Sequence, residues 1–269
     1  SPCYIQYEFE KPFWCRSLEI VANNNYQAQR LAIFASDDGA NFRKIKQLAP
    51  PRQGWQNTDE NFTFSIPETK AKYFRFYWDP AGSEPGAEDL DGAKWSPTLR
   101  IRNILLSSDS KIENFEGKNG SIWRLSKRSK IDEIPLENSI KLKDVFEINP
   151  AHLSNGILNT SLPRGKWKII RMGHTSTGHT NATGGGGRGL EVDKFNKGAI
   201  SIQLENWFGA AFVKTDSMLA KQVLKYMHVD SWECGSQNWS GNFTTEFQKR
   251  RGYDLTPYLL VYTGIPLES

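Results

Sequence analysis

The sequence predicts a multidomain β plus α/β protein, with a β-sandwich over residues 1–126, a connecting segment over residues 127–165 and an α/β segment over residues 166–269. In the first part, short segments of alternating apolar and polar residues are separated by clusters of Asn, Asp, Gly and Pro, the pattern of an antiparallel sandwich. After Pro163 the pattern changes to strand, polar loop and helix, which is typical of a parallel α/β barrel or a doubly wound sheet.

The predicted sandwich strands share period-2 alternation bounded by turn residues. They cover residues 4–9, 17–21, 30–36, 42–47, 62–66, 73–78 and 99–106. The clearest turn between them contains Asp38-Gly39, because Gly supplies the positive φ that tight hairpins need. The connecting segment is charged and interrupted by Pro135 and Pro150, and residues 140–148 predict a further strand within it.

The α/β segment begins with a predicted strand over residues 166–172, followed by a long polar loop. Asn196 is placed to cap a helix that extends to residue 213, a second strand follows over residues 224–230, and a helix over residues 244–251 ends at Gly252. A complete (β/α)8 barrel needs about 250 residues. The 104 residues from 166 to 269 would therefore form only part of a barrel.

Composition excludes several classes of function. The 34 basic and 30 acidic residues are spread along the chain, as on a solvated surface, so we expect no nucleic-acid partner. No apolar run approaches the roughly 18 residues of a membrane span, and the N-terminus lacks the regions of a signal peptide. Because the chain starts within a strand-like segment, we expect it to be a piece of a longer protein. The 3 cysteines lack zinc spacing, and Cys3 and Cys15 either pair or are two buried thiols.

The end of the second predicted strand carries the most chemistry. Its apolar residues lead directly into a polar cluster that contains Asp230, Trp232, Glu233, Gln237 and Asn238, and α/β enzymes keep their reacting groups at strand ends. Partial desolvation beside Trp232 would raise the pKa of Glu233 and keep it protonated, as a general acid requires. The alternative is a solvated, salt-bridged surface glutamate.

Two segments together resemble a known family. The segments GLEVDKF, residues 189–195, and HVDSWECGSQNW, residues 228–239, followed by EFQKRRGYDLTPYL, residues 246–259, resemble glycoside hydrolase family 106, the inverting α-L-rhamnosidases of bacteria that degrade plant polysaccharide. The resemblance implies a large, periplasmic or secreted enzyme with a (β/α)8 catalytic domain, β-rich accessory domains and a calcium requirement. Its substrate would be an oligosaccharide or polysaccharide that contains rhamnose.

A second resemblance concerns the sandwich. The segments FASDDGANF, residues 34–42, and AKYFRF, residues 71–76, are similar to a discoidin-like, galactose-binding-like jelly roll. Within such a sandwich, Trp55 and Trp95 lie in predicted loops and are candidate carbohydrate platforms, whereas Trp78 ends an apolar strand and is expected in the core.

Inverting glycosidases use a general acid and a general base about 6.5–9.5 Å apart. We assign Glu233 as the acid and expect the base outside this chain, although Glu191 could also serve. Glu191, Asp193 and Lys194 could bind sugar hydroxyls, and the two acids offer hard oxygen ligands for calcium. The alternative is that these acids only charge the N-terminus of the following helix.

Further substrate contacts are predicted at His174 and His179, which could hydrogen-bond a sugar, and at Trp239, which could stack on a pyranose. Two histidines without a third ligand make a poor zinc site. The glycine run at residues 184–189 lacks the Lys-Ser/Thr ending of a phosphate-binding loop, so it indicates loop slack or a loop that closes over a sugar.

Two other functions stay open on the sequence. The chain could be a non-catalytic, discoidin-like carbohydrate-binding module whose α/β segment is scaffold. It could also be an inactive fragment of a family 106 enzyme.

Overall fold

The computed structural model describes residues 1–23, 30–49, 61–82, 98–121, 134–180, 187–229 and 234–268. The chain forms two compact units. Unit 1 contains Ser1–Met172 and Leu255–Ser269, and unit 2 contains Gly173–Asp254. The C-terminal residues from Leu255 onward thus belong to unit 1 and not to unit 2.

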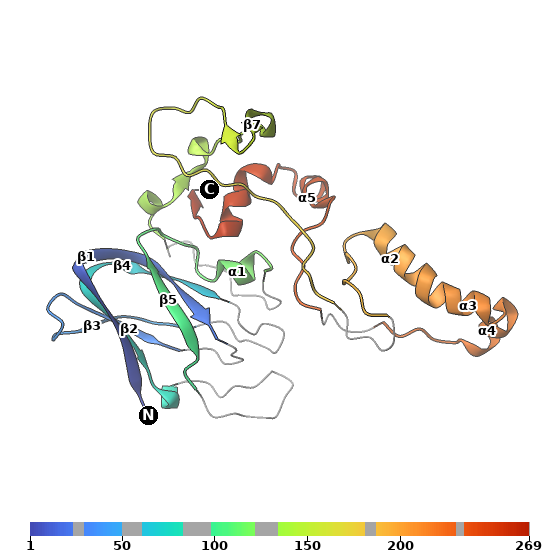
Figure 1. Ribbon diagram of the computed structural model, residues 1–269, viewed down its shortest axis with the longest axis horizontal. Helices are drawn as coiled ribbons and strands as arrows, with labels where there is room; N and C mark the ends of the chain where they lie inside the picture. The colour runs from blue at the N-terminus through green and yellow to red at the C-terminus, as the bar shows by residue number, and fades with distance from the viewer. Residues whose placement is uncertain are drawn as a thin grey trace. The chain divides into compact units, whose positions relative to one another are not determined.

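In unit 1 the five longest described strands form one antiparallel sheet in the order β3-β2-β4-β1-β5 (Figure 1). The strands are β1 (Cys3–Ala22), β2 (Ala32–Ser36), β3 (Arg43–Gln47), β4 (Phe62–Trp78) and β5 (Ile101–Ser107). All neighbouring strands in this sheet run antiparallel. The antiparallel β class predicted for this part of the chain is therefore confirmed.

Two pairs of predicted strands are single long strands in the structure. β1 and β4 run through positions where the sequence predicted breaks, at Pro12 and at Pro67. The register between them shifts between Glu8 and Phe13 and again between Cys15 and Ser17. A proline cannot donate to the ladder, but a bulge leaves residues unpaired and so accommodates it. The sheet continues across both prolines for this reason.

The core of unit 1 lies against this sheet. Its largest fully buried side chains include Phe64, Phe74 and Phe76 from β4, Leu18 from β1 and Ile104 from β5. Trp78 is also buried in this cluster, as predicted. Burying a side chain of this size contributes roughly 1.5–3 kcal/mol, so the two long strands supply most of the anchors of the core.

The predicted Asp-Gly turn joins β2 to β3. The Asp38 carboxylate accepts hydrogen bonds from the backbone N–H groups of Ala40 and Asn41, at 2.9 and 2.8 Å, and from the Asn41 amide. These bonds hold the pKa of Asp38 well below its ordinary value. Gly39 has a φ of 77°, which confirms the expected need for glycine.

The C-terminal residues close unit 1 through hydrogen bonds to the segment after β5. Lys111 Nζ donates to the carbonyl of Thr263 at 2.8 Å, and Ile112 N–H donates to the carbonyl of Gly264 at 2.8 Å. The elements involved are α1 (Phe115–Lys118), η3 (Leu136–Asn138), η7 (Thr256–Thr263) and a parallel pair of β6 (Ile140–Lys141) with β9 (Leu267–Glu268). The strand predicted over residues 140–148 is therefore wrong beyond its first two residues.

Smaller elements complete the described part of unit 1. They are η2 (Pro80–Gly82), η4 (Leu142–Asp144), η5 (Pro150–His152) and a short hairpin of β7 (Leu153–Ser154) with β8 (Ile157–Leu158).

Unit 2 contains both helices that the sequence predicted and a further helix, over Ser217–Val223, that it did not predict. α2 (Lys197–Leu204), the π-helical turn η6 (Glu205–Gly209) and α3 (Ala210–Lys214) follow one another without a break, and α4 (Ser217–Val223) follows them (Figure 1). Asn196 caps α2 by accepting from the N–H groups of residues 198 and 199, at 3.0 and 3.3 Å. α5 (Phe243–Arg251) ends at Gly252 with a φ of 81°. The limits of both predicted helices are confirmed to within one residue.

The two strands predicted for the α/β segment are not strands in the structure. Residues 166–172 and 224–229 are irregular, and the described residues form no barrel. A central parallel strand needs neighbours on both sides to satisfy its backbone groups. No strand among the described residues pairs with either segment, so their apolar patterns do not produce strands here.

Large apolar side chains of unit 2 are exposed. Tyr226 is 95% exposed, Val229 81%, Val213 77% and Trp207 68%. Monomeric soluble proteins rarely leave this many apolar side chains uncovered in one region. These four residues, on η6, on α3 and on the segment after α4, are called the apolar residues of unit 2 below.

The three cysteines are all free thiols in the structure. Cys3 is exposed, whereas Cys15 is buried, and both lie on β1, so they do not pair, and the expectation of a buried thiol is wrong for Cys3. Burial raises the pKa of the Cys15 thiol to about 11.

None of the described helices is both long and apolar enough to cross a membrane.

Candidate functional site

The candidate site is built from two loops of unit 2, residues 187–196 before α2 and residues 234–242 before α5. Asp193 joins them. Its Oδ1 accepts hydrogen bonds from Gln237 Nε2 and from Phe195 N–H, the latter at 3.0 Å. Its Oδ2 accepts from the Ser240 hydroxyl at 2.8 Å. One carboxylate therefore fixes two segments that lie more than forty residues apart in the sequence.

Gln237 completes this connection. Its amide nitrogen also donates to the carbonyl of Trp239 at 3.1 Å, and its amide oxygen accepts from the backbone N–H of Lys194 at 3.1 Å. A side-chain amide can donate twice and accept twice. Most of that capacity is used inside the protein, so Gln237 is held in one orientation.

The pKa of Asp193 reflects these contacts. Burial alone would raise the pKa, but the hydrogen bonds from Gln237, Ser240 and Phe195 N–H outweigh it and hold the pKa of Asp193 below its ordinary value. Asp193 is therefore ionised at neutral pH.

Glu191 and Lys194 form a close ion pair beside Asp193. Lys194 Nζ lies 2.6 Å from Glu191 Oε1, and both side chains are mostly covered. The backbone N–H of Glu191 donates to the carbonyl of His179 at 2.9 Å, next to an antiparallel bridge between Thr180 and Leu190. The loop that follows Gly173 is thus tied to the first loop of the site.

Both predicted histidines lie against the second loop. The His179 imidazole occupies the space that a Cβ on Gly235 would need, and Gly235 has a φ of 69°. Only glycine fits at this position. The His174 ring lies 6.1 Å from the Trp239 ring, and Trp239 in turn contacts Phe243 with ring centroids 4.8 Å apart.

The structure thus brings together Glu191, Asp193, Lys194, His174, His179, Gln237 and Trp239, while Asn238 is half-buried in the second loop. Asp230, Trp232 and Glu233 lie outside the described residues, as do Trp55 and Trp95. Sequence reasoning missed Ser240 and Gly235. The buried Ser240 hydroxyl follows the predicted polar cluster directly, which was the available signal.

The described acids do not fit a calcium site. Calcium takes six to eight oxygen ligands, but the Asp193 oxygens accept from protein donors and Glu191 faces the Lys194 ammonium. Among the described residues, no group of three or more His, Cys, Asp or Glu side chains could hold a metal.

Comparison with known families decides the assignment. Glycoside hydrolase family 106, described as alpha-L-rhamnosidase, matches residues 15–269. The chain belongs to this family. The family match includes both loops of the candidate site and all of the described sheet except the start of β1.

One curated protein and one solved structure are similar to most of this chain. A protein of Formosa agariphila named "Putative beta-glucuronidase" is 34% identical over 209 residues, which cover 76% of this chain and 16% of that protein. The solved rhamnosidase from Novosphingobium sp. PP1Y is 21% identical and superposes with a TM-score of 0.71 over 98% of this chain and 23% of its own. The chain thus spans less than a quarter of the length of either protein.

A pectin-binding carbohydrate-binding module is also similar over 40% of this chain and 67% of its own, at 19% identity and a TM-score of 0.29. That score is too low to support any inference about binding.

Proposed function

We propose that this chain is part of a glycosidase that hydrolyses terminal α-L-rhamnosyl linkages in plant polysaccharide. The observation that carries the proposal is the family match across residues 15–269. The geometry of the two loops supports it, because Asp193 and Gln237 connect the residues before α2 to those before α5. Most of the residues that the sequence singled out for sugar contact lie on these loops.

Within this proposal, Glu233 is the general acid that protonates the leaving oxygen, and a carboxylate outside this chain activates water on the opposite face of the sugar. Glu233 immediately precedes Cys234 and Gly235 in the sequence. Gly235 packs against His179, and Gln237 is anchored to Asp193. The residues after Glu233 are therefore held on a fixed support, which a positioned acid requires.

The remaining site residues divide into two roles. Asp193, Gln237 and Ser240 hydrogen-bond mainly to one another, so they are positioning residues. Lys194, Glu191, His174, His179, Asn238 and Trp239 are the proposed substrate contacts, together with Asp230 and Trp232. Trp239 packs between His174 and Phe243, so it offers at most part of its ring to a sugar.

We also propose that the apolar residues of unit 2 are covered in the complete enzyme by further strands of a (β/α)8 barrel. The exposure of these side chains supports this proposal. Residues 224–229 also have no strand partner among the described residues, and a barrel strand needs such partners. Periplasmic or secreted location and a calcium ion bound elsewhere in the enzyme are further parts of the proposal. Removal of calcium with EDTA would test the latter by loss of activity.

β-Glucuronide hydrolysis is a second candidate, favoured by the name of the Formosa agariphila relative. A glucuronidase must bind a sugar carboxylate, and Lys194 is a cation of the described site that could do so. The close pair of Lys194 with Glu191 argues against this role, because the glutamate already neutralises the ammonium group.

The deciding experiment compares aryl α-L-rhamnoside with aryl β-D-glucuronide as substrates of the complete enzyme. We expect rhamnoside hydrolysis with inversion at the anomeric carbon, followed by NMR, and a loss of about 10²- to 10⁴-fold in kcat for Glu233→Gln. Glu147→Gln, an exposed glutamate of unit 1, is the matched control. Glucuronide hydrolysis alone, or full activity of Glu233→Gln, would refute the proposal.

The isolated chain provides a second test. We expect the purified 269-residue chain to be inactive, because the proposed general base lies outside it. Rhamnosidase activity of this chain would show that the base is present, with Glu191 as the first candidate to substitute.

A further inference from the structure

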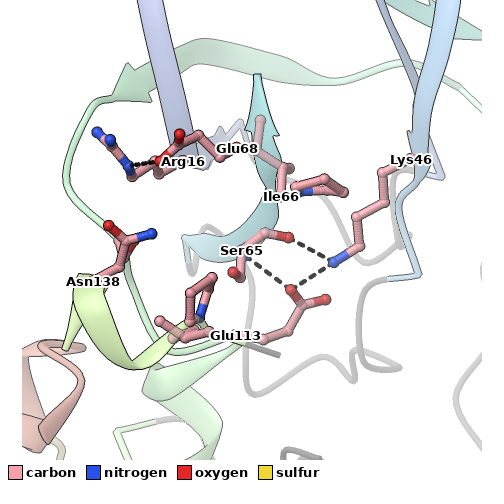
Figure 2. Close-up of a pocket in the computed structure, with 11 residues that line it drawn as sticks. Arg16, Lys46, Ser65, Ile66, Glu68, Glu113 and Asn138 are labelled. Carbon is pink, nitrogen blue, oxygen red and sulfur yellow. Dashed lines mark hydrogen bonds and ion pairs between the residues drawn. The ribbon is translucent and has the colours of Figure 1, made fainter. Parts of the chain in front are cut away.

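Unit 1 contains a pocket that is separate from the candidate site of unit 2. Its volume is about 590 Å³, within the range of roughly 300–1,000 Å³ that small-molecule sites occupy. It lies where Arg16 of β1, Lys46 of β3 and the 65–68 segment of β4 face Glu113 and Asn138 (Figure 2). We call it the Arg16 pocket.

The charges of the Arg16 pocket balance one another. Arg16 Nε lies 2.6 Å from Glu68 Oε2, and Lys46 Nζ lies 2.7 Å from Glu113 Oε2. Lys46 Nζ also donates to the carbonyl of Ser65 at 2.6 Å, and Glu113 Oε2 accepts from Ser65 N–H at 2.8 Å (Figure 2). Because each cation is already neutralised, the pocket does not select for an anion.

Part of the hydrogen-bonding capacity of these groups stays available. Arg16 uses Nε for Glu68 and Nη1 for the carbonyl of Ser108, at 2.9 Å. Within the described part of the chain, Arg16 Nη2, Glu68 Oε1 and Glu113 Oε1 make no hydrogen bond. The four charged side chains are between 18% and 38% exposed, so a ligand can reach them.

Residues that carry an unused donor and unused acceptors therefore line one cavity, and the ion pairs hold these residues in place. Neighbouring hydroxyl groups of a sugar ring donate and accept at once, so they match such a set, and hydrogen bonds to charged groups are the stronger ones. The apolar part of the lining comes from Ile66, Pro67, Ile134 and Pro135, beside the polar Ser65, Ser110 and Asn138. A pyranose presents apolar C–H faces between its hydroxyl groups, and these suit such walls.

We propose that the Arg16 pocket binds a neutral sugar residue of a mono- or disaccharide. Binding there is independent of the loops of unit 2 and of hydrolysis. In a polysaccharide-degrading enzyme, such a site would hold a stretch of substrate that is not being cleaved.

Saturation-transfer NMR on the complete 269-residue chain tests the proposal. The neutral probes are methyl α-L-rhamnoside, methyl β-D-galactoside and lactose, and the anionic probes are D-galacturonate and sulfate. We expect at least one neutral probe to bind, with at least tenfold loss of affinity in Arg16→Met. Arg43→Met removes a guanidinium that faces Asp37 at 3.7 Å outside the pocket, and it should bind as the wild type does.

A second variant separates loss of the pocket from loss of folding. The Asn138 side chain makes no hydrogen bond to the described residues, so Asn138→Trp should fill the pocket without removing an internal contact. We expect it to abolish binding of methyl β-D-galactoside and lactose with an unchanged circular dichroism spectrum, whereas Lys214→Gln, at an exposed position of α3 in unit 2, should leave that binding unchanged. The proposal is overturned if no neutral probe binds, if galactoside or lactose binding survives Asn138→Trp, or if galacturonate or sulfate binds more tightly.

Discussion

Asp193 shows how the structure changes the role of a residue that the sequence selected for its chemistry. The sequence placed it among ligands for sugar or calcium. In the structure both of its carboxylate oxygens accept hydrogen bonds from protein donors. Among the described acids, Asp193 is the one to which Gln237 and Ser240 donate. Its contribution is to hold two loops in register, and a ligand would have to displace these bonds.

We expect Asp193→Asn to loosen both loops, because an amide cannot accept all three hydrogen bonds of the carboxylate. The loss at pH 7 should be about 1–3 kcal/mol. The folded-state pKa of Asp193 is depressed, so its stabilisation is present above the unfolded-state pKa of about 3.9 and is lost as pH falls through the folded value. The difference between wild type and variant in urea midpoint should therefore shrink as the pH is lowered below about 4.

Asp144→Asn is the control for this measurement, because Asp144 is an exposed residue of unit 1 without a described side-chain hydrogen bond. It should change the urea midpoint little at either pH. Equal pH dependence in wild type and Asp193→Asn would contradict the role assigned to Asp193. Hydrogen exchange of residues 190–200 and 234–243 would show where the loosening occurs.

Among the secondary-structure elements, glycines at the ends of η7 and α5 offer a matched comparison. Both have a left-handed φ, 78° at Gly264 and 81° at Gly252. A Cβ on Gly264 would lie 2.5 Å from Phe115 Cδ1, whereas a Cβ on Gly252 would meet nothing within 4 Å. The first position therefore combines backbone strain with a close approach of η7 to α1, and the second has strain alone.

We expect Gly252→Ala to destabilise its unit by about 1–2 kcal/mol, the cost of a left-handed L-residue. Gly264→Ala should cost roughly 1–3 kcal/mol more, because Phe115 must move from its packed position. Urea unfolding together with hydrogen exchange of residues 111–121 and 243–254 measures the two losses. Equal effects at the two sites would mean that Phe115 moves without cost.

The elements also show how much of the fold the sequence could predict. Helix limits were predictable, because Asn196 and Gly252 act through local backbone geometry. The merging of strands across Pro12 and Pro67 was not, because it depends on bulges in the pairing of β1 with β4. The segments expected as strands at residues 166–172 and 224–230 are not strands over their described residues, because a strand needs a pairing partner that the apolar pattern does not reveal.

The candidate site follows the same division. The sequence identified the polar residues, because acids, amides and aromatics cluster around residues 191–194 and 230–239. It could not show that Gln237 donates to Asp193 and accepts from Lys194 N–H, because these hydrogen bonds join segments that are distant in the sequence. The Arg16 pocket was not predicted at all, since its lining comes from separate strands and from η3.

At the scale of the whole molecule, unit 1 has a closed apolar core, whereas unit 2 leaves Val213, Tyr226 and Val229 largely exposed. A fully exposed tyrosine stabilises the isolated chain little. The same side chain would contribute roughly 1.5–3 kcal/mol if the complete enzyme buries it.

We therefore expect Tyr226→Lys to change the stability of the isolated chain by less than about 0.5 kcal/mol and to lower its binding of the dye ANS. In the complete enzyme the same variant should be destabilised by about 2 kcal/mol or more, from lost burial and a buried charge. Ile157→Lys, at a 69% exposed position in unit 1, should have little effect in either protein. A small effect of Tyr226→Lys in both would contradict burial of unit 2 in the enzyme.

The return of residues 255–268 to unit 1 has a consequence for synthesis on the ribosome. The strands β1 to β5 are complete by residue 107, so the sheet can form early. Lys111 and Ile112 cannot form their hydrogen bonds to Thr263 and Gly264 until those residues leave the ribosome, which happens only after all of unit 2 has been synthesised. A chain that stops at residue 254 would therefore have a formed sheet but would lack the residues that bond to the segment after β5. Cellular proteases could then cleave that segment more readily.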